Sequence, residues 1–437
     1  MNQYRMHADT ALANSPRGVS TSQAISDTIL VDLDNDGDLD VILARSWLTK
    51  ETIPGRNVPI NNWNGGKPHP LGANAVLIND GRGRFSDEQI DLLGNKTCDT
   101  TGIAVGDLNG DGLLDVIVGN RHAENGTELT GTDLRPECQN CGGVPWTEEM
   151  LREDADCPSE VWLNNGQGNF TLVDGGDVSS VGRNTTAVAV GDLDNDGDLD
   201  IVMGNTLGLG CNGRSGDACT QAVATTYERD LVFQNDGSGR FSEVNSTPIS
   251  QGLHDTTCVV LLDIDGNGWL DVAIGAFAPT VRCTNPVCTW GNDHSQTLRL
   301  FFNEGGWSFT EINHFPRLLA TGVVVNQWNT NNAWGGAWPG LNMIRSMAWG
   351  DLDNDGDADC LVTRPMQMMP TLLRNDGNRS HVAMTGGNNY PGESWDIAFL
   401  QGSEDSSRQV EFADFDGDGD VSTQCSNPPC PIRLQRV

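Results

Sequence analysis

Acidic residues recur in this sequence at a spacing that suits a hard metal ion. The nine-residue stretch from Asp32 to Asp40 reads DLDNDGDLD. Five near copies of it start at Asp107, Asp192, Asp263, Asp351 and Asp414. Each copy has a carboxylate or carboxamide at positions one, three and five and a glycine at position six, and five of the six have Asp at position nine. Calcium takes six to eight oxygen ligands, and a turn containing glycine lets alternating side chains converge on one ion. The pattern therefore predicts about six calcium-binding loops.

The residues after each loop exclude an EF-hand, which begins in the same way. An EF-hand needs a bidentate Glu at position twelve and a helix on either side. Position twelve is occupied here by Leu43, Val118, Met203, Ile274, Val362 and Cys425. Each loop leads instead into an apolar run rich in β-branched residues, such as residues 41–44, 116–119 and 201–204. The loops are therefore expected to join strand to strand.

A second motif lies between the calcium loops. Short Asn- and Gly-rich segments begin at Asn79, Asn165, Asn235, Asn303 and Asn375. Asn-Gly and Asp-Gly steps between apolar runs indicate β-hairpins in which both turn residues have positive φ. Each unit then comprises a strand, a calcium loop, a strand, a variable connection, a strand, a tight hairpin and a strand. Four antiparallel strands per repeat predict the blade of a propeller.

The repeats predict an all-β fold, a β-propeller of four-stranded antiparallel blades that fills residues 1–437 as a single domain. Six blades are expected, with seven as the alternative, at about residues 23–93, 98–175, 182–246, 254–315, 343–389 and 408–437, with an insertion at residues 318–341. Only five hairpins accompany the six loops, so the last blade has chain for three strands. Residues 1–22 are expected to supply the missing strand. A continuation beyond the last blade, or a strand from a neighbouring molecule, is the alternative.

Composition indicates which classes of partner and which cellular compartment suit the chain. The formal net charge is −34, and the six loops hold 25 of the 60 acidic residues, so six bound calcium ions would bring the charge to −22. The remaining acidity argues against nucleic acid and anionic membranes, and no apolar run is long enough to span a bilayer. Twelve cysteines favour disulfides over zinc, with close pairs at Cys211/Cys219, Cys283/Cys288 and Cys425/Cys430 and a cluster of Cys138, Cys141 and Cys157. Glycosylation sequons occur at Asn95, Asn125, Asn169, Asn184, Asn245 and Asn378. An extracellular or cell-surface protein is expected.

The two motifs per repeat resemble those of the FG-GAP/VCBS repeat family, whose calcium-bearing propellers include the head domain of integrin α chains. The resemblance implies calcium between the first two strands of each blade, and an extracellular role in adhesion, carbohydrate binding or scaffolding. The side chains that it implies as ligands are Asp32, Asp34, Asp36 and Asp40; Asp107, Asn109, Asp111 and Asp115; Asp192, Asp194, Asp196 and Asp200; Asp263, Asp265, Asn267 and Asp271; Asp351, Asp353, Asp355 and Asp359; and Asp414, Asp416 and Asp418. Position seven would contribute a backbone carbonyl, from Asp38, Leu113, Asp198, Trp269, Asp357 and Asp420. The sixth loop departs from the pattern with Ser422 at position nine, so its site is expected to be weaker.

No catalytic motif such as HExxH or GxSxG occurs, and the histidines are scattered. The sequence therefore favours a non-enzymatic structural or adhesion module whose calcium stabilises the blades and whose partners are other extracellular proteins or copies of itself. The alternative is a calcium-dependent lectin-like propeller that binds glycans through Trp328, Trp334 and Trp338, which are interleaved with asparagines. A polysaccharide-cleaving enzyme is a less favoured alternative.

Overall fold

The computed structural model describes most of the strands that the repeats predict. It covers residues 24–46, 74–85, 98–121, 157–206, 229–276, 298–312, 344–363 and 371–384, apart from one or two residues at a time, and shorter stretches between 208 and 226, 281 and 290, and 410 and 432. These residues form antiparallel strands and two 3-10 helices, η4 (Asp177–Ser179) and η5 (Pro248–Ser250). In the described part of the chain, no helix has the length and hydropathy needed to cross a lipid bilayer.

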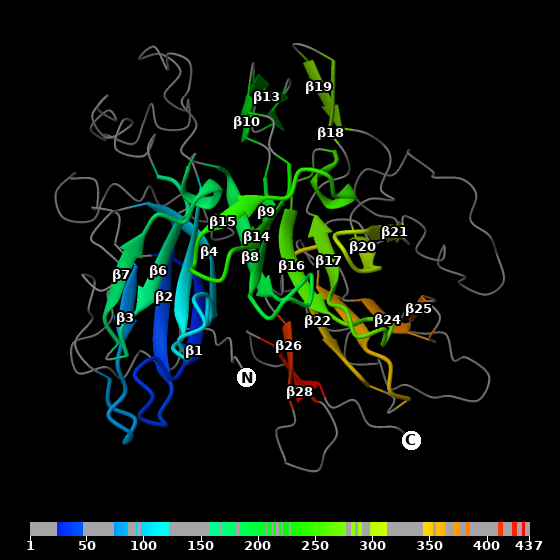
Figure 1. The fold of residues 1–437 in the computed structure, drawn as a ribbon. Coiled ribbons are helices and arrows are strands. Elements are labelled where there is room, and N and C mark those ends of the chain that lie inside the picture. Colours follow the sequence, from blue (N-terminus) through cyan, green and yellow to red (C-terminus); the bar gives the residue numbers. More distant parts are fainter. Residues whose placement is uncertain are drawn as a thin grey trace. The chain divides into compact units, whose positions relative to one another are not determined.

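The strands form successive antiparallel sheets, each built from neighbouring segments of the chain (Figure 1). The first sheet contains β1 (Ala24–Val31), β2 (Asp40–Ser46) and β3 (Ala75–Leu77). The second contains β4 (Asp99–Gly106), β5 (Asp115–Arg121), β6 (Glu160–Asn164) and β7 (Phe170–Val173). The third contains β8 (Thr185–Gly191), β9 (Asp200–Asn205), β14 (Leu231–Asn235) and β15 (Phe241–Glu243).

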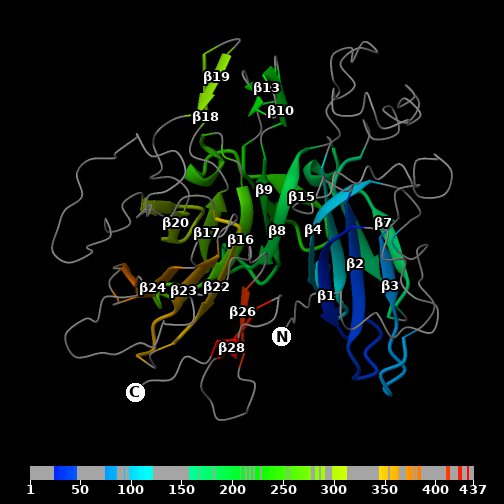
Figure 2. The ribbon, with the colours of Figure 1, turned by 180° about the vertical axis from the view of Figure 1, so that it is seen from behind.

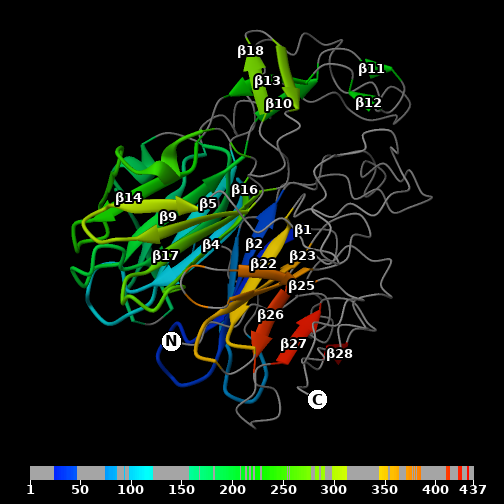
Figure 3. The same cartoon turned by 90° about the vertical axis from the view of Figure 1, so that its right-hand side faces the viewer.

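The second half of the chain continues the series. The fourth sheet contains β16 (Thr256–Leu262), β17 (Asp271–Ala276), β20 (Leu298–Asn303) and β21 (Phe309–Ile312), with β16, β17 and β20 side by side in Figure 2. The fifth contains β22 (Ser346–Gly350), β23 (Asp359–Thr363), β24 (Thr371–Asn375) and β25 (His381–Met384). A last sheet contains only β26 (Val410–Ala413), β27 (Ser422–Cys425) and β28 (Pro431–Ile432), labelled in Figure 3.

Three short strand pairs lie in the connections. They are β10 (Gly208–Cys211) with β13 (Ala222–Thr226), β11 (Arg214–Ser215) with β12 (Ala218–Cys219), and β18 (Val281–Thr284) with β19 (Val287–Trp290).

The fold is an all-β propeller with four-stranded antiparallel blades, as the sequence predicts, but the described residues form five blades rather than six or seven. Four sheets have four strands, and the first is completed by an isolated antiparallel bridge between Asn79 and Phe85. The prediction of six full blades is corrected because the last sheet has three described strands, of four, four and two residues. The proposed closing strand at residues 1–22 lies outside the described residues.

The chain divides into two compact units. The first holds residues up to Val190 together with Gly197–Gly210 and Ala224–Val244, and so contains the first three sheets. The second holds Gly191–Asp196, Cys211–Val223 and Asn245–Val437, and contains the later sheets. The loop that starts at Asp192 therefore contributes residues to both units.

Apolar clusters lie between successive sheets within each unit. In the first unit, one cluster joins Ile29 and Ile42 of the first sheet to Ile103 and Val118 of the second. In the second unit, another joins Leu300 of the fourth sheet to Val362 of the fifth. Ile117, next to Val118 in β5, packs in a second cluster together with residues of the third sheet, so both faces of this inner strand are covered. This explains why the runs after the loops are continuously apolar and do not alternate with polar residues.

Candidate metal centres

In loops one, two, four and five, the carboxylate of the first residue accepts hydrogen bonds that fold the loop. Asp32 accepts hydrogen bonds from the backbone N–H groups of Asp36 at 3.1 Å and Gly37 at 3.0 Å, which are positions five and six. The same pair of bonds is made to Asp107, Asp263 and Asp351. Gly37 has φ of 94°, in a region that favours glycine, so position six can turn the backbone back toward position one. Spacing alone therefore produces a turn whose side-chain oxygens gather on one side.

The last residue of the loop is a buried connector. In the second loop, Asp115 has no exposed surface, and its two oxygens accept from Leu108 N–H at 2.9 Å and from Asn164 N–H at 2.8 Å. Loops one, four and five repeat the arrangement through Asp40, Asp271 and Asp359. Burial raises the pKa of Asp115 and of Asp271 to about 6 and also raises the pKa of Asp40. The Asp at position nine thus links the loop to the hairpin of its own sheet. The sequence predicted this residue only as a calcium ligand and did not predict the link.

The asparagine that opens each hairpin reaches back to the preceding repeat. Asn164 is buried, and its Nδ2 donates to Leu33 O at 2.8 Å and to Leu114 O at 3.0 Å. Leu33 belongs to the first loop and Leu114 to the second, so one side chain bridges two repeats. Asn235, Asn303 and Asn375 make the equivalent bonds to Leu108, Leu193 and Ile264. The sequence pattern predicted only a turn at each of these asparagines. Other residues also suit a turn, so the recurrence of Asn at this position was the one sign in the sequence that its side chain has a further role.

The hairpins are one residue longer than the sequence suggests. In the first, Asp80 N–H donates to Arg84 O at 3.0 Å, which leaves three residues in the loop. The residues with positive φ are Gly81 and Gly83, both at 72°, and not the predicted Asp80–Gly81 pair. A three-residue loop with a left-handed residue at its end is the next most common hairpin connection after the two-residue turns.

The first loop has the donor set and the unmet charge that a cation would satisfy. Asp32, Asp34 and Asp36 each place a carboxylate oxygen within 4.8 Å of the others. Oδ1 of Asp34 is buried and has no hydrogen-bond partner. Burial, with the neighbouring charges of Asp36 and Asp32, raises the pKa of Asp34. Hard oxygen donors that converge without a compensating cation fit calcium well.

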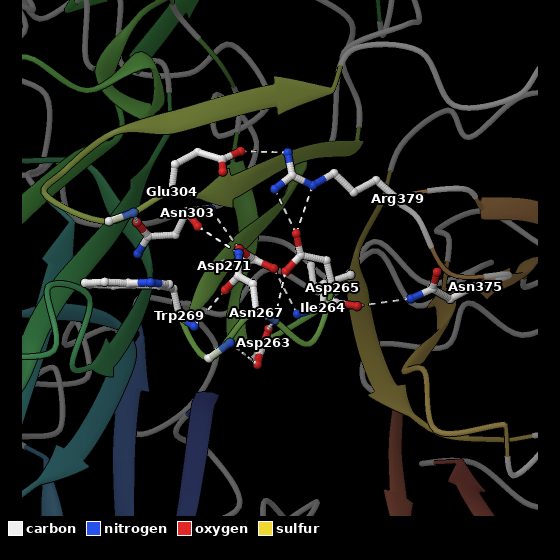
Figure 4. Close-up of polar contacts among 12 residues, drawn as sticks. Asp263, Ile264, Asp265, Asn267, Trp269, Asp271, Asn303, Glu304, Asn375 and Arg379 are labelled. Carbon is white, nitrogen blue, oxygen red and sulfur yellow. Dashed lines mark hydrogen bonds and ion pairs between the residues drawn. The ribbon is translucent and has the colours of Figure 1, made fainter.

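The fourth loop differs because an arginine from the fifth sheet lies against it (Figure 4). Asp263, Asp265 and Asp271 again place carboxylate oxygens within 4.8 Å of one another. Arg379 contacts Oδ2 of Asp265 through both Nε and Nη2 at 2.8 Å, and its Nη1 lies 2.7 Å from Oε1 of Glu304. Its guanidinium also lies over the ring of Phe302, 4.6 Å from the centroid. This loop already contacts a positive charge.

A family comparison agrees with the repeat pattern. A family model described as FG-GAP-like repeat matches residues 63–118, 151–203 and 216–274. Each match ends shortly after one of the loops, in β5, β9 or β17. The chain contains FG-GAP-like repeats. In these repeats the loop and the hairpin together form one corner, because position nine and the hairpin asparagine are hydrogen-bonded to each other.

Solved structures also resemble this FG-GAP-like chain, at low identity. A lectin from Agrocybe aegerita that recognises non-reducing terminal N-acetylglucosamine is 16% identical, with a TM-score of 0.40, over 81% of this chain and 64% of its own. A Tc holotoxin pore from Photorhabdus luminescens is 13% identical, with a TM-score of 0.37, over 98% of this chain and 14% of its own. A rhamnogalacturonan lyase from Bacillus licheniformis is 18% identical, with a TM-score of 0.30, over 74% and 57%. The chain thus spans less than two thirds of each of these proteins. Among curated protein sequences, none matches the chain.

Several predicted site residues of the FG-GAP-like chain lie outside the described residues. These are Asp353 of the fifth loop, the whole sixth loop with Asp414, Asp416, Asp418 and Asp420, the tryptophans Trp328, Trp334 and Trp338, and the sequons at Asn95, Asn125 and Asn378. Of the other sequons, Asn169 and Asn245 are exposed. Asn184 is only 2% exposed, so a glycan on it would have no path to solvent and that candidate is withdrawn.

The cysteines are only partly described. Cys98 and Cys157 form a disulfide with a Cα–Cα distance of 5.9 Å, which joins the start of the second sheet to the end of the connection before β6. Cys157 therefore pairs with a residue outside the predicted cluster. Cys258 and Cys360 are not disulfide-bonded. The side chains of the predicted close pairs, and Cys138 and Cys141, lie outside the described residues.

Buried His254 has an ordinary structural environment. It is 5% exposed, and burial together with the charge of Arg299 lowers its pKa to about 3. The imidazole is therefore neutral at pH 7 and shielded from solvent.

Proposed function

We propose that this FG-GAP-like chain is a calcium-stabilised, non-enzymatic propeller that serves as a structural or adhesion module in extracellular protein–protein assembly. The observation that carries the proposal is the position of the loops. Each described loop is fixed by a buried Asp to its own sheet, and in the first four loops a buried Asn of the following repeat binds a carbonyl of the loop. An ion in such a loop acts on the joint between repeats and only indirectly on a distant ligand.

Calcium stabilisation follows from the charge of the loops. The first loop carries five acidic residues within nine positions, and Asp34 has a buried oxygen without a partner. Repulsion among these groups is relieved when a divalent ion binds, so binding and folding are coupled. An ion at 100 times its dissociation constant stabilises the folded state by about 2.7 kcal/mol per site. Several sites acting together supply a large share of the stability of an ordinary domain.

The disulfide supports an extracellular location. Disulfides persist in oxidising compartments, and the same compartments hold enough calcium to fill sites of modest affinity. The strongly acidic surface keeps such a module soluble and away from anionic membranes and nucleic acid. Partners are expected to be other extracellular proteins or further copies of this chain.

The proposal is tested by measuring thermal stability and molar mass in millimolar calcium and then in chelator. We expect calcium to raise the unfolding temperature by at least about 3 °C, which for a chain of this length corresponds to on the order of 3 kcal/mol. Magnesium at the same concentration serves as the control, because it requires stricter octahedral geometry. An unfolding temperature that is the same in calcium and in chelator would contradict the calcium role.

Molar mass by light scattering addresses the assembly role. A species larger than the 47.0 kDa chain in calcium, which dissociates in chelator, is the expected result for self-assembly. A monomer in both conditions, with no retention of extracellular protein partners, would contradict it. The glycan alternative rests on Trp328, Trp334 and Trp338 and stays a prediction. Retention on immobilised glycans that is lost in Trp334→Ala would favour it over the assembly role.

A further inference from the structure

The hairpin position four residues after the leading asparagine changes along the chain. Gly83, Gly168 and Gly239 occupy it in the first three sheets, with φ between 66° and 81°, and Trp307 occupies it in the fourth at a φ of 64°. The fifth sheet has Arg379 there, at a φ of 61°, and so places a positive charge at this position. A non-glycine residue in this left-handed region costs on the order of 1 kcal/mol, so the arginine is held there by its contacts.

The glycine at this position faces the loop of the preceding repeat. A Cβ atom added to Gly168 would lie 3.0 Å from Cδ1 of Ile78 and 4.0 Å from Cβ of Asp34. Ile78 directly precedes the hairpin asparagine of the first sheet, and Phe302 holds the same place in the fourth. Arg379 stacks on Phe302 and reaches Asp265, which is position three of its loop, as Asp34 is of the first. At this hairpin position, Gly168 has no side chain that could contact Asp34 of the first loop. Arg379 has one, and it contacts the equivalent residue of the fourth loop, Asp265.

The contacts of Arg379 replace what a metal ion would supply. Its guanidinium binds Asp265, whose side chain is 11% exposed, and Glu304 of the adjacent hairpin. The fourth loop also carries three acidic residues, while the first carries five. Fewer negative charges and a fixed positive one both reduce the repulsion that calcium would relieve.

We propose that Arg379 is the resident cation of the fourth loop, so that the joint between the fourth and fifth sheets holds without calcium and this loop binds calcium more weakly than the first. The inference rests on the proposed calcium stabilisation of the other loops. Removing the guanidinium removes repulsion toward a divalent ion and is expected to raise the affinity of this loop for calcium about tenfold. The same change makes the joint depend on calcium.

The test uses hydrogen exchange followed by mass spectrometry on the full chain, in calcium and in chelator. Wild-type peptides covering residues 263–271 should stay protected in chelator, while those covering residues 32–40 lose protection. In Arg379→Gly, which introduces the residue of the first three hairpins, the 263–271 peptides should lose at least tenfold in protection in chelator and regain it in calcium. Isothermal titration with calcium alone should show about a tenfold tighter class of site in this variant.

Two further variants separate charge from packing. Arg379→Met keeps an unbranched aliphatic side chain next to Phe302 and loses the charge. It should show the same calcium-dependent protection of residues 263–271 that is expected of Arg379→Gly, and it provides the test if the glycine variant does not fold. Arg240→Gly removes an equal charge from an exposed ion pair with Asp174 and should leave residues 263–271 calcium-independent.

The outcomes distinguish the two proposals. Unchanged protection in both Arg379 variants overturns the inference, and so does a loss of protection that calcium does not restore. If no peptide of the wild type responds to calcium, the proposed calcium stabilisation itself fails, and the inference fails with it.

Discussion

The first and fourth loops have the same backbone hydrogen bonds, which we call the loop frame. They differ in which group balances the negative charge of the Asp at position three. In both, position one accepts from the N–H groups of positions five and six, and position nine accepts from position two and from the hairpin asparagine. At position three, Asp34 keeps a buried oxygen without a partner, while Asp265 binds Arg379. The backbone of the loop is therefore held by hydrogen bonds within its own repeat, whereas the charge at position three of the fourth loop is balanced by a hairpin of the next repeat.

The largest expected effect tests whether the frame is common to both loops. Asp40→Ala and Asp271→Ala each leave two buried backbone N–H groups without an acceptor. We expect each to lower the free energy of unfolding in chelator by about 4 kcal/mol, at 1–3 kcal/mol per unsatisfied group plus the lost packing. Urea unfolding measures this, and Leu39→Ala, at an exposed side chain, is the control with an effect below about 0.5 kcal/mol. A large effect in only one loop would show that the frames differ.

The next effect concerns the bridging asparagines. Asn164→Ala removes the donor to Leu33 and Leu114, and Asn375→Ala removes the donor to Ile264 and Ala358. Each should cost about 2–3 kcal/mol in urea unfolding. Hydrogen exchange should reveal the contrast, because Arg379 still links the sheets in Asn375→Ala. Equal loss of protection at the two joints in chelator would contradict a linking role for the arginine.

The pH dependence in chelator follows from the buried position-nine carboxylates. The pKa of Asp271 is about 6 in the folded chain, above the value of about 3.9 in an unfolded chain. Its contribution to stability is thus fully present below about pH 4 and is lost as the pH rises through 6. Asp115 behaves alike, so stability in chelator should fall by about 2 kcal/mol per group between pH 4 and pH 7. Urea unfolding at a series of pH values measures this fall, and calcium should reverse it at pH 7.

The smallest effect returns to the shared frame. Gly37 and Gly268 occupy position six with φ of 94° and 88°, and an added Cβ would contact nothing within 4 Å at either. Alanine there therefore introduces backbone strain without a clash, and each variant should lose about 1 kcal/mol by urea unfolding. Unequal losses would mean that the two turns are not equivalent.

Local patterns predicted much of this molecule. The DxDxDG spacing identified the turn at Asp32 and the strand after it, and the Asn-Gly segments identified the hairpins, because both depend on residues close in sequence. The bond from Asn164 to Leu33 spans 131 residues and that from Arg379 to Asp265 spans 114, so no local pattern reports them. The number of blades also escaped prediction, because six loop motifs do not ensure six complete sheets.

The direction of the asparagine bridge has a consequence for how such chains change length. Each of the first four loops is bound by an asparagine of the next repeat, so the second, third and fourth repeats carry both halves of a joint. A duplicated repeat therefore brings both halves of a new joint with it, and its neighbours meet the groups they met before. Propellers built in this way can gain or lose a whole repeat by a single genetic event without a new interface having to arise first.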